Sequence, residues 1–187
     1  MAILSFDIGI RNLAYCILDE QQHIQDWKVL SLSHRKRIQY DILCESVVQT
    51  LNQIDLTQFN IQQVVLERQM TAKMRVVCAM IQTYYVVKGI PTVLFSPVHK
   101  LQSLPINEQD AQLVPIRAKK NTYGYRKNLS KQFCKILLER NHEKNEMIDL
   151  YMKSTKKDDL SDSYLQGLAF QSKKNILNNQ ITVSIEH

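Results

Sequence analysis

The sequence predicts an α/β domain built on a mixed five-stranded sheet, in which three antiparallel strands are followed by parallel strands and helices flank the sheet. Short runs of β-branched and aromatic residues open the chain, and the links between them are too short for a crossover. Two later apolar runs alternate with segments of helical periodicity, as in parallel strands joined by right-handed crossovers. The 187 residues are 44% hydrophobic, enough for one sizeable core.

The first three strands are expected at Ala2–Ile8, Leu13–Leu18 and Ile24–Leu30. The turns between them fall at Gly9–Asn12 and Asp19–Gln22, which are rich in turn-forming residues. Because such short links can only reverse the chain, neighbouring strands in this group should run antiparallel.

An amphipathic helix is expected over residues 34–54. Its apolar residues Leu43, Val47 and Leu51 recur at steps of four, and Ser33 is a candidate N-cap.

The next unit is strand, helix, strand. Ile61–Glu67 is a near-continuous apolar run, typical of a strand buried on both faces. Apolar residues at helical spacing over Met74–Tyr85 predict a second helix, which should stop near Gly89 with Pro91 close behind. Thr92–Phe95 is the fifth expected strand.

The last third of the chain is predicted to be mostly helical. Residues 96–122 show no sustained period and are expected to form an irregular connection. Helical periodicity resumes at Tyr125–Arg140, lapses over Asn141–Lys157 and returns at Asp159–Phe170.

We expect one domain over residues 1–171, followed by a C-terminal tail at 172–187 that packs on it. The tail is polar and then briefly β-like at Ile181–Ile185. The four cysteines are widely spaced and form no zinc pattern, so they are expected to be reduced and mostly buried: Cys16, Cys44, Cys78 and Cys134.

Composition bounds the location and the partners. No apolar run approaches the roughly 20 residues of a membrane span, and the first strand leaves no room for a leader, so a soluble, intracellular protein without membrane contact is expected. The net charge of +6 favours a polyanionic partner such as nucleic acid. There is no Gly-rich phosphate loop, and no organic cofactor is expected.

Acidic residues stand at the ends of the elements most expected to be buried. Asp7 closes the first strand, Glu67 closes the fourth, and Asp159 and Asp162 begin the last helix. Three residues apart on a helix, the last two share one face and can converge with the first two. Four carboxylates suit a pair of divalent cations, because buried charge must be paired or metal-bound and hard cations prefer oxygen ligands.

Simpler interpretations remain open for some of these residues. The aspartates before the last helix could serve only to cap it and to complement its dipole. Asp158 also shares a face with Asp162, at a spacing of four, so the register of the motif is ambiguous. Gly9 could bring the hairpin backbone close to a ligand, adopt positive φ, or be an ordinary turn glycine.

Three segments together resemble the RuvC-type Holliday junction resolvases of the RNase H-like superfamily, and most closely the poxviral, other large-DNA-virus and mitochondrial branch. The sequence Phe6-Asp7-Ile8-Gly9-Ile10-Arg11-Asn12 looks like that family's first-strand motif. Leu66-Glu67-Arg68-Gln69 looks like its central-strand motif, and Asp159-Leu160-Ser161-Asp162-Ser163 like its D-x-x-D at the head of the last helix. In order, the three cover Ala2 to about Phe170.

The resemblance implies an RNase H-like fold and a homodimeric, structure-selective endonuclease that resolves four-way DNA junctions by paired symmetrical nicks. It implies two Mg²⁺ ions per active site, with Mn²⁺ as an expected substitute, held by Asp7, Glu67, Asp159 and Asp162, with Asp158 as an auxiliary residue. A viral member, acting in the host cytoplasm or at sites of viral DNA replication, is favoured over a mitochondrial one. Met70, Met74, Met80 and Tyr84, in and beside the second helix, are candidates for the dimer interface or for core packing.

A basic segment precedes the last acidic motif and includes Lys119, Lys120 and Lys127. By resemblance, Lys127 is the candidate for a catalytic lysine beside the scissile phosphate. The residues expected to contact DNA are Arg11, Asn12, Arg68, Lys119, Lys120, Arg126 and Lys131. A solvated helix face is the simpler interpretation of the basic segment. The basic run at residues 34–37 could contact phosphate or be an exposed, frayed helix end.

Two other functions stay open. Another RNase H-like nuclease, acting on RNA–DNA hybrids or flaps, would share the metal site. A catalytically silent junction-binding protein would keep the basic face but would have no use for four convergent carboxylates.

Overall fold

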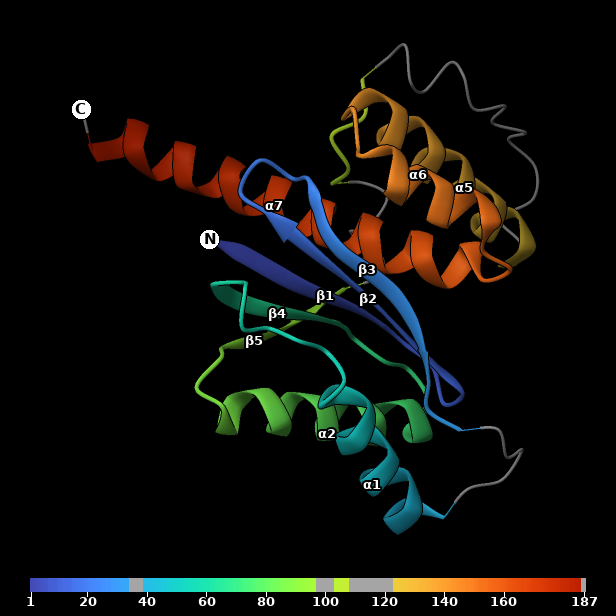
Figure 1. Ribbon diagram of the computed structural model, residues 1–187. Helices are drawn as coiled ribbons and strands as arrows, with labels where there is room; N and C mark the ends of the chain where they lie inside the picture. The colour runs from blue at the N-terminus through green and yellow to red at the C-terminus, as the bar shows by residue number, and fades with distance from the viewer. Residues whose placement is uncertain (34–38, 97–102, 108–122, 186–187) are drawn as a thin grey trace.

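The structure is a computed structural model that describes residues 1–33, 39–96, 103–107 and 123–185 (Figure 1). The strands form one five-stranded sheet of order β3-β2-β1-β4-β5. Their bounds are β1 Ala2–Ile8, β2 Asn12–Asp19, β3 Ile24–Ser31, β4 Ile61–Glu67 and β5 Thr92–Phe95. The helices are α1 Tyr40–Leu51, α2 Ala72–Val87, α5 Tyr123–Arg140, α6 Asn145–Lys153 and α7 Lys157–Ile185.

The sheet is mixed, as the sequence predicts. β1 pairs antiparallel with β2, and β2 with β3, whereas β4 runs parallel to both β1 and β5. All five predicted strands are present, and their ends differ from the predicted ones by one residue at most. The RNase H-like arrangement expected from the motifs is therefore confirmed at the level of strand order and direction.

Helices cover both faces of the sheet (Figure 1). On one face, α1 and α2 pack on a core that includes Leu4, Phe6 and Leu66. On the other face, α5, α6 and α7 pack on a core that includes Ile3 and Val65. Because side chains alternate along a strand, Asp7 and Glu67 fall on the second face, toward α7.

Glycine and cysteine residues behave largely as expected. The second helix ends two residues before Gly89, which has φ of +76° and so provides the left-handed stop. All four cysteines are free, and only Cys44 is exposed.

The first predicted helix is wrong at its start. α1 begins at Tyr40, and its N-cap is Gln39, which makes no side-chain capping bond. Ser33 is therefore not the cap. Its N–H and that of Leu32 donate to the carbonyl of Arg11, so the chain still follows the sheet at that point. The basic run at 34–37 lies outside the described residues.

Two predictions about the last third are also wrong. Residues 141–157, expected to lack helix, contain α6, whose Tyr151 is buried and whose Met147 and Ile148 pack on the core. The β-like segment Ile181–Ile185 is helical, because α7 continues through it without a break. Extending an existing helix adds one hydrogen bond for each residue fixed, which outweighs the weak strand preference of a few β-branched residues. The division at residue 171 stays a prediction.

Candidate active site

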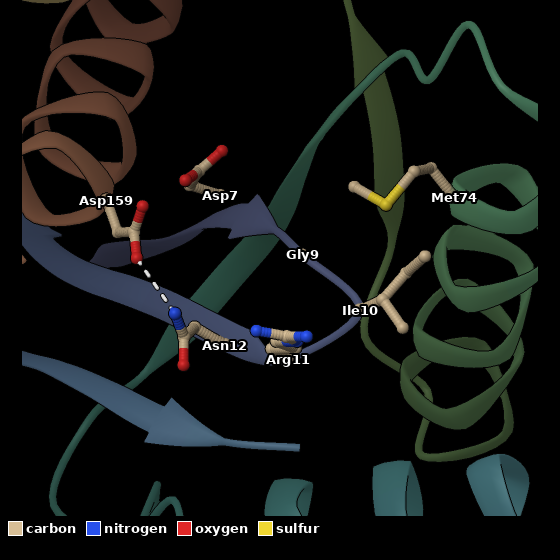
Figure 2. Close-up of a pocket in the computed structure, with 7 residues that line it drawn as sticks. All are labelled: Asp7, Gly9, Ile10, Arg11, Asn12, Met74 and Asp159. Atoms are coloured by element: carbon tan, nitrogen blue, oxygen red, sulfur yellow. Dashed lines mark hydrogen bonds between the residues drawn. The ribbon is translucent and has the colours of Figure 1, made fainter. Parts of the chain in front are cut away.

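A cavity of about 260 Å³ opens where the β1–β2 turn meets the start of α7 (Figure 2). Two of the predicted carboxylates, Asp7 from β1 and Asp159 from α7, line it. The cavity residues are Asp7, Gly9, Ile10, Arg11, Asn12, Met74 and Asp159. The first-strand motif and the last-helix motif, about 150 residues apart in the sequence, therefore share one site.

The β1–β2 turn is held by backbone hydrogen bonds on both sides. Gly9 N–H donates to the carbonyl of Asn12 at 2.9 Å, and Leu32 N–H donates to that of Arg11 at 2.7 Å. A Cβ on Gly9 would lie 2.6 Å from the carbonyl oxygen of Asn12, so this position requires glycine because of a close backbone approach. Positive φ is not the reason, since Gly89 is the only described glycine with a positive φ angle.

Asn12 lies between an acidic and a basic side chain at the site. In one orientation its amide Nδ2 donates to Asp159 Oδ2 at 3.3 Å, as Figure 2 shows. In the other orientation its amide oxygen accepts from Lys156 Nζ at 3.2 Å. Either way, the amide connects the β1–β2 turn to the head of α7, through Asp159 in the first orientation and through Lys156, the residue before the helix, in the second.

Two buried aromatic residues, Trp27 and Tyr151, fix the start of α7. Trp27 Nε1 donates to the carbonyl of Leu160 and to Ser163 Oγ, both at 3.1 Å. The indole ring stacks on Tyr151, with ring centroids 5.6 Å apart, and the Tyr151 hydroxyl hydrogen-bonds Ser161 Oγ at 3.0 Å. These contacts hold the helical turn that carries Asp159 and Asp162.

The pKa values of Asp158 and Asp159, at the start of α7, shift in opposite directions. Burial raises the pKa of Asp159, and the charge of Asp158 raises it further, against the opposing charges of Lys156 and Lys127. Burial also disfavours the charged form of Asp158, but the hydrogen bond and charge of Lys127 outweigh it and lower that pKa. Asp158 is therefore ion-paired with Lys127, whereas burial leaves Asp159 with an unfavourable charge that a bound cation would stabilise.

Glu67 and Asp162 do not line this cavity. Glu67 is half-buried at the end of β4, where Gln69 Nε2 donates to its Oε2 at 3.4 Å. Asp162 is half-buried one turn beyond Asp159. In the parts of the chain that the structure describes, no group of three or more His, Cys, Asp or Glu side chains is arranged to hold a metal ion. The four-ligand set stays a prediction.

The donor chemistry nevertheless fits a hard cation. Asp7 and Asp159 offer carboxylate oxygens beside the Asn12 amide in one cavity. Mg²⁺ is commonly bound through one or two carboxylates, with waters and substrate phosphates completing its shell.

The basic candidates are distributed over several places. Lys127 Nζ contacts Asp158 Oδ2 at 2.5 Å, which brings this lysine to the head of α7. Arg11 is exposed and lines the cavity. Arg126 is exposed and Lys131 half-buried on α5, while Lys119 and Lys120 lie outside the described residues. Arg68 lines a different hollow of about 620 Å³, together with Lys173 and Lys174.

The side chains suggested for a dimer interface divide between surface and core. Met70 is 83% exposed just before α2. Met74, Met80 and Tyr84 are half-buried against the core beneath the sheet, as the core-packing alternative expects.

None of the helices in the described ranges combines the length and apolar character needed to cross a membrane.

Sequence reasoning missed Gln166, which is 2% exposed and bonds both β1 and β4. A signal was present, because Gln166 stands four residues after Asp162 and seven after Asp159, on the same helical stripe, between Leu165 and Leu168. A polar residue in that position is unusual in a helix that packs on a sheet.

Three solved structures with the same fold are resolvases. The chain resembles the Fowlpox virus resolvase, solved with substrate Holliday junction DNA, at 22% identity and a TM-score of 0.62 over 92% of this chain and 98% of that one. It resembles the yeast mitochondrial Holliday junction resolvase Ydc2 at 19% identity and a TM-score of 0.65, over 95% of this chain and 82% of that one. The chain also resembles RuvC of T. thermophilus, solved with a Holliday junction substrate. The sequence identity is 10% and the TM-score 0.63, over 94% of this chain and 96% of that one.

Comparison with curated protein sequences gives no match. The structural likenesses, all below 25% identity, establish an RNase H-like fold of the resolvase type. The model of the family described as "Poxvirus A22 protein" matches residues 1–174. Since that match covers nearly all of the 187 residues, this chain belongs to the Poxvirus A22 protein family.

Proposed function

We propose that this protein is a metal-dependent endodeoxyribonuclease that resolves four-way DNA junctions by paired symmetrical nicks. The observation that carries the proposal is the shared cavity of Asp7 and Asp159, with Arg11 and Asn12 on its rim. Carboxylates for a metal and one cationic group for a phosphate, Arg11, line the same cavity. The family match and the fold shared with three resolvases support the same activity.

The proposed metal ligands are Asp7, Glu67, Asp159 and Asp162. Two Mg²⁺ ions, or Mn²⁺ in their place, would supply Lewis-acid stabilisation of the charge that develops on phosphodiester oxygens during an in-line displacement by water. The chain's own contribution is to place these carboxylates at the ends of β1 and β4 and at the start of α7, where the substrate backbone can approach.

Lys127 is proposed to face the reacting phosphate. Its ammonium, held by Asp158, carries positive charge to the head of α7. As the attacking oxygen bonds to phosphorus and the bridging P–O bond breaks, negative charge grows on the phosphate oxygens, and a fixed ammonium stabilises that charge more than it stabilises the ground state.

Affinity for the junction is proposed to come mainly from phosphate contacts. Arg11 and Asn12 on the β1–β2 turn, Arg68 after β4, and the basic residues of α5 and of the segment before it are the candidates. Such contacts position the backbone without reading sequence, as a structure-selective enzyme requires.

We also propose a homodimer. Symmetrical cleavage of two opposing strands requires two active sites related by a two-fold axis. Within this family, the proposed substrates are branched intermediates of viral DNA recombination and replication.

The test is single-turnover cleavage of a synthetic four-way junction with each strand labelled in turn, in Mg²⁺ and in EDTA. A linear duplex, a flap and an RNA–DNA hybrid of matched sequence form the substrate panel, and Asp7→Asn is the inactive control. We expect paired nicks at symmetric positions in the junction alone, dependent on metal. Preference for the hybrid or the flap would identify another RNase H-like nuclease, and junction binding without cleavage would identify a silent binding protein.

A further inference from the structure

One buried amide connects α7 to the two strands that end in carboxylates. The two N–H groups of the Gln166 amide are shared among three acceptors: Ser5 Oγ at 3.2 Å, the carbonyl of Phe6 at 3.1 Å and the carbonyl of Val65 at 3.2 Å. The side chain is only 2% exposed. Hydrogen bonds are directional, so these three contacts fix where α7 lies along β1 and β4.

The contacts fall within two residues of the two strand ligands, Asp7 and Glu67, and come from the helix that carries the other two. Ser5 and Phe6 directly precede Asp7, and Val65 stands two residues before Glu67. Gln166 itself follows Asp162 by four residues, which is about one turn of the same helix. One side chain therefore reaches all three elements that carry the carboxylates.

The neighbouring glycine makes this short contact feasible. A Cβ on Gly167 would lie 2.7 Å from Leu18 Cδ1 and 3.2 Å from Ser5 Cβ. Glycine inside a helix costs about 1 kcal/mol relative to alanine. At this position it lets the helix backbone approach β1 and β2 closely enough for the Gln166 amide to reach main-chain carbonyls.

Stability alone does not call for glutamine here. The residues on either side of the Gln166–Gly167 pair, Leu165 and Leu168, are fully buried, so an apolar side chain would continue the core. A buried amide is costly unless it is hydrogen-bonded, and an apolar contact would let the helix slide more freely over the sheet. What the amide adds is a defined register between helix and strands.

We infer that Gln166 is a positioning residue that sets the placement of Asp159 and Asp162 relative to Asp7 and Glu67. This inference rests on the proposed function, because it assigns the four carboxylates to one metal-dependent site. Residues that orient metal ligands from behind typically contribute ten- to a hundredfold in metal affinity or activity.

The test compares two glutamines on the same helix. Gln166→Met keeps the length and bulk of the side chain but removes the three hydrogen bonds. Gln171→Met is the matched control, since Gln171 is also buried and its Nε2 donates to the carbonyl of Asp19 at 2.8 Å, at the end of the sheet away from Asp7. Mn²⁺ affinity by titration calorimetry, single-turnover junction cleavage and thermal unfolding are measured for both.

We expect Gln166→Met to raise the Mn²⁺ dissociation constant roughly ten- to a hundredfold and to slow cleavage by a similar factor. Gln171→Met should lower the melting temperature but change neither the Mn²⁺ dissociation constant nor the cleavage rate. Ser5→Ala removes one of the three acceptors and keeps the fold, so it should show the same two effects at several-fold smaller size. If Gln166→Met does not fold, the Ser5→Ala variant decides whether Gln166 positions the carboxylates.

Each outcome separates the two proposals. If the Gln166 and Ser5 variants bind Mn²⁺ and cleave like the Gln171 variant, Gln166 is only a packing residue and the inference is overturned. If they lose Mn²⁺ affinity while the wild-type protein fails to cleave any junction, the positioning role stands and the proposed function fails. Absence of Mn²⁺ binding by the wild-type protein overturns both.

Discussion

Lys127 on α5 and Asp158 at the start of α7 form an ion pair, with Nζ 2.5 Å from Oδ2. Their side chains are 33% and 28% exposed, so the pair is neither buried nor freely solvated. It joins the basic helix to the acidic motif. It also gives Asp158 a role distinct from that of Asp159, which lines the cavity with Asp7.

The first prediction concerns this pair. Lys127→Ala should lower the single-turnover cleavage rate at saturating protein on the order of a hundredfold, because a donor to the developing charge is removed. Asp158→Asn should cause a smaller loss, since the lysine remains but is less well held. The double variant should be no slower than Lys127→Ala, because both changes act through one ammonium.

Lys135→Ala is the matched control for that prediction. Lys135 lies two turns further along α5 and pairs with Glu139 of its own helix at 3.8 Å. Its loss should leave the saturated rate unchanged. Because partly exposed pairs contribute only about 0–1 kcal/mol, thermal unfolding should barely distinguish the three single variants. A wild-type rate for Lys127→Ala at saturation would reduce Lys127 to a general DNA contact.

The second prediction separates the carboxylates. Asp7→Asn, Glu67→Gln, Asp159→Asn and Asp162→Asn should each abolish cleavage in Mg²⁺ and leave junction binding intact or slightly tighter, because affinity comes from phosphate contacts elsewhere. The measurements are single-turnover cleavage and gel-shift affinity in Ca²⁺. Near-normal cleavage by the Asp162 variant would show that the site consists only of the carboxylates lining the cavity. An inert Asp158 variant beside an active Asp159 variant would shift the motif by one residue.

The third prediction concerns the β1–β2 turn. Gly9→Ala places a methyl group 2.6 Å from the backbone oxygen of Asn12, which cannot move without opening the hairpin. We expect a loss of about 1–3 kcal/mol in the free energy of unfolding, measured in urea. Cleavage should fall more than binding, because Arg11 and Asn12 shift with the turn.

Gly124→Ala is the control for the turn variant. Gly124 lies in α5, and nothing stands within 4 Å of a Cβ added there. This change should leave the free energy of unfolding unchanged or raise it by up to about 1 kcal/mol. Equal stability of the two alanine variants would contradict the steric account of Gly9.

The fourth prediction is a pH dependence at Glu143, which contacts the start of β3 and does not line the carboxylate cavity. Glu143 is 4% exposed, and both its oxygens accept from Ile24 N–H at 3.1 Å. Burial raises its pKa above the ordinary value of 4.5, with Asp19 adding to the shift and Ile24, His23 and Lys144 opposing it. Between pH 4.5 and the raised pKa the folded state binds more protons than the unfolded state, so the free energy of unfolding falls as pH rises.

Urea unfolding across pH 4 to about 8 tests this sign. Glu143→Gln keeps an oxygen for Ile24 and carries no charge, so its stability should improve relative to the wild-type protein as pH rises through that window. Glu143→Ala should cost about 1–3 kcal/mol at every pH, because it leaves a buried N–H without an acceptor. A constant difference between the glutamine variant and the wild-type protein would show that folding does not shift the pKa of Glu143.

The strands were predictable because their signals are local. Ile61–Glu67, for example, is a short run with β-branched Val64 and Val65 at its centre, which favours a strand. The helix at Asn145–Lys153 was missed because it is short and lacks a side-chain cap, although Met147, Ile148 and Tyr151 do mark an apolar face. Its position depends on the stacking of Tyr151 on Trp27, which no local pattern records.

The site was predictable as a set of acidic motifs but not as a set of contacts. That Asp7 and Asp159 line one cavity follows the expected convergence of strand end and helix start. The pairing of Lys127 with Asp158 and the bonds of Gln166 to β1 and β4 join residues 31 to 161 positions apart. Such contacts are set by how α5 and α7 dock, and docking is a property of the whole core.

The placement of α7 across β1 has a consequence for biosynthesis. Asp7 leaves the ribosome early, whereas Asp159 and Gln166 follow only after the sheet and the preceding helices have been made. A nascent or truncated chain that ends before α7 lacks two of the four proposed metal ligands and the amide proposed to align them. The proposed hydrolytic activity would therefore be acquired only late in translation, once α7 has docked on the sheet.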